Sequence, residues 1–105
     1  MDKEELKKRF EKEMHQVYKN VTKIHHPPTY LLRLIDDNGG FAAAVILLEK
    51  SEPSQTFFTL WELNRLDLSV ETLVLKEPWR QLFEQRHLDE AERRLKDLNY
   101  NPYKN

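Results

Sequence analysis

Apolar side chains recur at intervals of three and four along the first part of the chain, and charged residues fill most positions between them. This spacing places the apolar side chains on one helical face. They are Leu6, Phe10, Met14, Val17, Tyr18, Val21 and Ile24. The pattern predicts a long helix from about Lys3 to Ile24. It is expected to end at His25-His26-Pro27-Pro28, because a residue before proline avoids the α region.

Two short apolar segments follow. Thr29 is a predicted N-cap for a helix that stops at Asn38-Gly39-Gly40, where Gly39 is free to adopt the left-handed conformation of a helix end. The eight apolar residues from Phe41 to Leu48 fit a buried strand or a buried helix. Three consecutive alanines and the absence of a partner strand favour a helix, which we expect to be the most buried element.

Hydroxyl side chains mark the starts of the next helices. Ser51 or Ser54 is expected to cap a helix from Gln55 to about Asn64, and Ser69 to cap another, with Glu71 in its first turn. Pro78 suits the first position of a further turn. The last helix is predicted from about Gln85 to Leu98. Its buried stripe is expected to comprise Leu88, Ala91, Leu95 and Leu98, with the charged residues, Arg93 and Arg94 among them, mostly in solvent.

Length and composition limit the fold. The chain has 105 residues, 39% of them hydrophobic and only two of them glycine. That is enough for one modest core, and scarce glycine disfavours sandwiches and barrels, which need many turns. We therefore predict an all-α fold, a compact single-domain bundle of five or six helices over residues 1–100. The long first helix is expected to pack against the last helix, and residues 101–105 to form a frayed tail.

Charge and cysteine content limit the expected ligands, the side-chain chemistry and the cellular location. Seventeen basic and eighteen acidic residues give a net charge of −1, so no global field draws the chain toward nucleic acid or anionic lipid. Cysteine is absent from the sequence, which excludes disulfides and thiolate chemistry. The longest apolar run, from Phe41 to Leu48, is far shorter than the roughly 20 residues that span a bilayer. We expect a cytoplasmic protein without membrane association.

Several short motifs follow one another in the middle of the chain: Asn38-Gly39-Gly40, Ser51-Glu52-Pro53-Ser54, Leu60-Trp61-Glu62, Arg65-Leu66-Asp67-Leu68-Ser69 and Leu73-Val74-Leu75. Together with Trp79 and later residues, they resemble the pattern of a family of small, uncharacterised bacterial proteins over about residues 17–100. The resemblance implies an all-helical fold and carries no activity, ligand or site. The chain departs from the pattern at Gln85-Arg86-His87, where acids that open the last helix are expected.

Candidate catalytic and metal-binding residues are few. The four histidines, His15, His25, His26 and His87, lack the spacing of a helical zinc pair, so we predict surface or capping roles, with no metal and no cofactor. Glu62, Asp67 and Glu71 border one inter-helix turn and could perform acid–base chemistry if a deep pocket raised the pKa of one of them. Capping and pairing with arginine explain such acids more often. We therefore predict a protein that is not an enzyme.

The aromatic residues suggest a binding role instead. Most are expected in the core, but a small domain cannot easily hide two tryptophans, and an exposed tryptophan beside an arginine is a common interface anchor. The predicted partner-binding residues are Trp61, Trp79, Arg65 and Arg80. The leading hypothesis is a non-enzymatic helical interaction or accessory module whose partner is another protein.

A nucleic-acid-associated helical domain is the alternative. It requires the first and last helices to lie side by side and combine their basic residues into one patch. The residues concerned are Lys7, Lys8, Lys12, Arg86, Arg93 and Arg94. Interleaved glutamates favour a solvated face with ion pairs between successive turns over a phosphate-binding patch. The sequence leaves the oligomeric state open.

Overall fold

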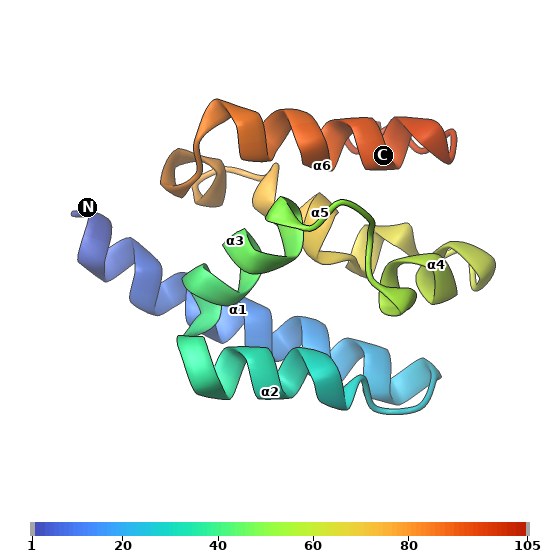
Figure 1. The fold of residues 1–105 in the computed structure, drawn as a ribbon, viewed down its shortest axis with the longest axis horizontal. Coiled ribbons are helices and arrows are strands. Elements are labelled where there is room, and N and C mark those ends of the chain that lie inside the picture. Colours follow the sequence, from blue (N-terminus) through green and yellow to red (C-terminus); the bar gives the residue numbers. More distant parts are fainter. Residues whose placement is uncertain (1, 105) are drawn as a thin grey trace.

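The structure, a computed structural model, describes residues 2–104 and is built from helices, with no strand in that range. The elements are α1 (Lys3–Ile24), α2 (Thr29–Asn38), α3 (Gly40–Glu49), α4 (Gln55–Glu62), η1 (Leu66–Leu68), α5 (Val70–Val74), η2 (Trp79–Leu82) and α6 (Gln85–Asp97), where η denotes a 3₁₀ helix. Figure 1 shows this arrangement. The predicted all-α bundle is confirmed, with six α-helices among the described residues. None of these helices is long and apolar enough to cross a membrane.

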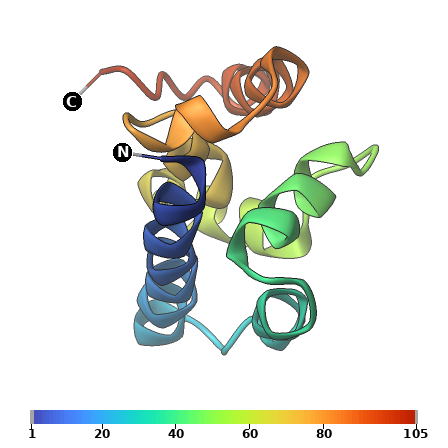
Figure 2. The ribbon, with the colours of Figure 1, turned by 90° about the vertical axis from the view of Figure 1, so that its left-hand side faces the viewer.

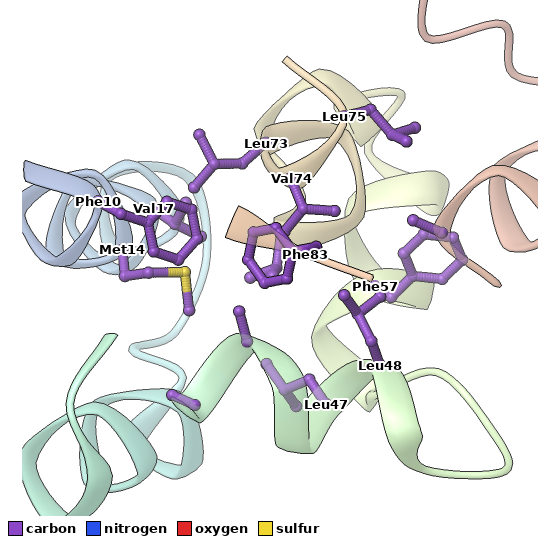
Figure 3. Packing of buried hydrophobic residues seen from close by; sticks show 14 of the residues in the cluster. Phe10, Met14, Val17, Leu47, Leu48, Phe57, Leu73, Val74, Leu75 and Phe83 are labelled. Carbon is purple, nitrogen blue, oxygen red and sulfur yellow. The ribbon is translucent and has the colours of Figure 1, made fainter. Parts of the chain in front are cut away.

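The helices enclose one core. Figure 1 shows α1 and α2 on one side of the molecule and α6 on the other, with α3 and α5 between them; the perpendicular view of Figure 2 agrees. The first and last helices contribute to the same buried cluster, as predicted. Phe10 of α1 is fully buried, and its ring centroid lies 5.4 Å from that of Phe83, just before α6. Figure 3 shows side chains of α1, α3 and α5 meeting around Phe83.

Side-chain caps set several helix boundaries. As predicted, Ser54 accepts a hydrogen bond from the Phe57 amide at 3.3 Å, and Ser69 accepts one from the Thr72 amide at 3.1 Å. The prediction for Thr29 is wrong, because Thr29 is the first residue of α2 and no side chain caps this helix. Each capped amide is one that helix geometry leaves without an internal partner.

One helix end differs from the predicted boundary. Helix α4 ends at Glu62, two residues early, and Asn64 follows with φ +60°, in the left-handed region. In the tail, the Tyr103 hydroxyl donates a hydrogen bond to Glu92 at 2.5 Å, and the Tyr103 amide donates one to Asn101. For residue 105, the predicted fraying lies outside the described residues, as does Met1 of the predicted domain.

Gly39 and Gly40 let α3 approach α1 closely. Gly39 has the expected positive φ, +85°, although its ψ of 161° is extended and not left-handed helical. The Gly40 amide donates a hydrogen bond to Oε1 of Glu11 at 2.8 Å. A Cβ atom on Gly40 would lie 2.7 Å from the Glu11 Cα, too close for two carbon atoms. The start of α3 therefore has to be a residue without a side chain.

We expect Gly40→Ala to destabilise the fold by about 1–3 kcal/mol, the usual range for overpacking, because backbone has to move to admit the methyl group. Urea unfolding measures this change. Asp37→Ala, at an exposed position of α2, is the control and should change stability by less than about 0.5 kcal/mol. Equal stability of Gly40→Ala and the wild type would show that α1 and α3 do not approach this closely.

Candidate functional site

Helix α4 presents two aromatic residues to solvent, and one of them, Trp61, is a predicted partner-binding residue. Its buried residues are Phe57 and Leu60, which fix the rotation of the helix about its axis. Phe58 and Trp61 consequently lie on an outer face, with exposed fractions of 37% and 48%. Side chains three positions apart on a helix are neighbours. We call this pair, Phe58 and Trp61, the α4 aromatic face.

The arginine predicted beside Trp61 already has a partner. Arg65 follows α4, and its guanidinium donates to both carboxylate oxygens of Asp67, at 3.0 and 3.2 Å. Both side chains are about half exposed. The positive charge of Arg65 is therefore largely compensated by Asp67, and the α4 aromatic face itself consists of two uncharged side chains.

Trp79 lies elsewhere. It belongs to η2, and Figure 1 shows η2 and α4 at opposite ends of the long axis of the molecule. The Trp79 ring is half-buried, with its centroid 5.9 Å from that of Phe10. Arg80 donates a hydrogen bond to the Leu75 carbonyl at 3.1 Å. The four predicted partner-binding residues thus divide into two groups, and no single face contains both tryptophans.

Most of the predicted nucleic-acid residues are paired with acids. Lys7 lies 3.8 Å from Glu4 and also over the Phe41 ring. The predicted arginines of α6 are paired as well. Arg86 pairs with Glu49 and Glu84, and Arg93 pairs with Glu90 and Asp97. Lys8 and Lys12 are exposed on α1. The ion pairs of Lys7, Arg86 and Arg93 are the kind expected on a solvated face.

Arg94 is buried, contrary to the prediction that it faces solvent. Its side chain is 1% exposed. Nε donates to Glu90 at 2.7 Å, and Nη1 donates to Glu71 at 3.0 Å. The Leu47 and Lys50 carbonyls accept two further bonds, at 3.2 and 2.8 Å. The guanidinium therefore joins α6 to α5 and to the end of α3, and we call these five residues the Arg94 network.

Among the three predicted acids, Glu71 is the one that is buried. Burial raises the pKa of its carboxyl, and the hydrogen bond from Arg94 opposes this shift. Glu71 also lines a cavity of about 20 Å³, together with Ser54, Ser69 and Tyr30. Such a volume holds about one water molecule and leaves no room for a substrate. Glu62 and Asp67, the other two predicted acids, are exposed. The three acids do not form a common acid–base site.

His87 confirms the predicted capping role for a histidine. With Glu84 it forms a capping box at the start of α6, and the Glu84 amide donates to its Nδ1 at 3.4 Å. Because Nδ1 accepts, the proton lies on Nε2, which donates to Glu49 at 2.9 Å. Among the described residues, no cluster of three or more histidine or acid side chains suits a metal ion.

Comparison of the chain with protein-family models, with curated proteins and with solved structures finds no match. The resemblance to small bacterial helical proteins therefore rests on the motifs alone.

One sequence signal for the burial of Arg94 was available. Position 94 lies three residues after Ala91 and four before Leu98, on the edge of the apolar stripe of α6. The charge of the arginine side chain nevertheless indicated a solvent-exposed position. No comparable signal pairs it with Glu71, because the two residues come together only when α5 and α6 pack.

We expect Arg94→Met to lower the free energy of unfolding by about 3–5 kcal/mol, because it leaves the buried Glu71 carboxyl without its partner. Chemical denaturation measures the change. Arg93→Met, at the adjacent position, removes only exposed ion pairs and should lose less than about 1 kcal/mol. Similar losses in the two variants would contradict the structural role assigned to Arg94.

The raised pKa of Glu71 predicts a pH dependence. Above pH 4.5, the ordinary pKa, the unfolded carboxyl loses its proton while the folded one still holds it. The native state then binds more protons, so its stability falls as pH rises through the raised pKa. Glu71→Gln lacks this titration. We expect the stability of the wild type minus that of Glu71→Gln to decrease from pH 4.5 toward neutral pH in urea titrations. A difference that rises with pH would show that Arg94 keeps the carboxylate ionised.

Proposed function

We propose that the chain is a non-enzymatic helical interaction module that binds another protein through the α4 aromatic face. The observation that carries this proposal is the exposure of Trp61, which is 48% accessible beside the 37% accessible Phe58. Tryptophan is among the residues that contribute most to interfaces when a partner buries it. Two adjacent aromatic rings supply a large apolar anchor with few rotatable bonds.

The support beneath these rings favours binding with little reorganisation. Ser54 caps the start of α4, and Phe57 and Leu60 fix the helix in the core. The rings therefore stand on a helix that is already formed, and a partner does not have to order it. The partner expected from this chemistry is a protein with an apolar pocket. We further infer a cytoplasmic location in a bacterial cell, from the cysteine-free sequence and the motif resemblance.

Truncating the α4 aromatic face should remove binding without unfolding the protein. We expect Trp61→Ala to reduce the recovery of a specific protein from extract of the source organism by at least about tenfold, as loss of an anchor residue would. Immobilised wild type and variant are compared by quantitative mass spectrometry, and circular dichroism confirms that the variant is folded.

Tyr103→Ala is the matched control, because Tyr103 is a similarly exposed aromatic, at 56%, on the C-terminal tail. It should recover the same protein as the wild type does. The proposal is wrong if Trp61→Ala, Tyr103→Ala and the wild type all recover the same proteins in equal amounts.

A further inference from the structure

A groove runs along the first half of α1, beside η2. Its lining comprises Glu5, Lys8, Arg9, Lys12, Glu13 and Trp79, and its volume is about 700 Å³. Both views place η2 next to the N-terminal part of α1, and Figure 1 shows this end of the molecule opposite α4. Lys8 and Lys12 were predicted for one function and Trp79 for another, and the structure brings the three together. We call this feature the α1 groove.

Trp79 provides a fixed apolar wall for the groove. Its ring packs against the fully buried Phe10, so one side belongs to the core. The ring is half-buried and also lines the groove. A ligand with an apolar side chain can therefore cover the remaining aromatic surface without displacing the ring.

Two lysines leave positive charge in the groove. Arg9 lies 3.6 Å from Glu5, and these charges offset each other. Among residues 2–104, no acid lies within ion-pair distance of Lys8 or Lys12, and both are exposed. They stand four positions apart, so they are neighbours on one side of the helix. Glu13 is the remaining acid of the lining.

We propose that the α1 groove binds an acidic peptide segment of another protein. Two of its carboxylates would pair with Lys8 and Lys12, and an apolar side chain between them would pack on Trp79. Acidic residues four positions apart on a partner helix match the spacing of the two lysines. This binding is separate from that of the α4 aromatic face, which lies at the other end of the molecule.

The lining favours a peptide over a nucleic acid. Glu5 and Glu13 also face the groove. A continuous chain of phosphates would pass close to both acids, where like charges repel. A peptide can place carboxylates opposite the lysines and neutral residues opposite the acids. The net charge of −1 adds no general attraction for a polyanion.

Trp79 fluorescence tests the proposal directly. Trp61→Phe leaves Trp79 as the only tryptophan of the chain. The probe is a short synthetic helical peptide with glutamates four positions apart and leucine between them, and the comparison peptide carries lysines in place of the glutamates. We expect a saturable change in Trp79 emission with the acidic peptide only, which weakens as salt is added.

Charge reversal then locates the binding. In the same Trp61→Phe background, Lys8→Glu with Lys12→Glu should weaken binding of the acidic peptide by about tenfold or more, since two ion pairs become repulsive contacts. The control reverses Lys19 and Lys23, which are exposed, also four positions apart on α1, and absent from the lining of the groove. It changes the net charge equally and should weaken binding much less.

Three results would overturn the proposal. The first is no saturable emission change with the acidic peptide, or an equal one with the lysine peptide. The second is equal weakening by the two double variants, which would mean attraction by overall charge alone. The third is tighter binding of a single-stranded oligonucleotide than of the acidic peptide, which would assign the groove to nucleic acid. None of these results bears on the Trp61 pull-down, so the two proposals can fail separately.

Discussion

The buried guanidinium of Arg94 is the constraint on which the arrangement of the helices depends. Arginine stays protonated in proteins, so it cannot avoid burial by losing its charge and has to be met by acceptors. Four residues from three places in the chain supply them: Glu90 on its own helix, Glu71 on α5, and the Leu47 and Lys50 carbonyls at the end of α3. The carbonyls at a helix end lack internal partners. One side chain therefore satisfies the end of α3 and fixes its position on α6.

The net contribution of a buried ion pair to stability is small, because desolvation offsets much of its attraction. The pair acts together with a second contact at the opposite end of α3. There the Gly40 amide is bonded to Glu11 of α1, at a contact too close for any side chain. Helix α3 is thus positioned at its start against α1 and at its end against α6. The turn that follows leads directly to α4, so these two contacts also determine where Phe58 and Trp61 emerge.

The sequence predicts the parts of this structure that depend on local spacing. The stripe of α1 and the caps at Ser54 and Ser69 follow from periodicity and from residue type within a few positions. The prediction that α3 is the most buried element is wrong, because five of its ten residues are buried whereas all five residues of α5 are. The Arg94 network and the separation of Trp61 from Trp79 were missed, because both depend on how distant helices pack. For Arg94, the spacing from Ala91 and Leu98 indicated burial, whereas the charge indicated exposure to solvent. Burial was decided by acceptors that lie 23 to 47 positions away along the chain.

Because the two tryptophans lie at opposite ends of the molecule, the single predicted interface is replaced by two separate candidate surfaces. A standard interface covers about 800 Å² on each protein, which is roughly an eighth of the 6509 Å² surface of this chain. The longest dimension is 36 Å, so one such interface can occupy each end without meeting the other. The ends also differ in chemistry, since the α4 aromatic face is mainly apolar and the α1 groove carries lysines. Salt should weaken contacts in the groove far more than contacts with Trp61, because screening acts on charges and not on apolar burial. If both proposals hold, the molecule would join two different partner segments through two separate surfaces.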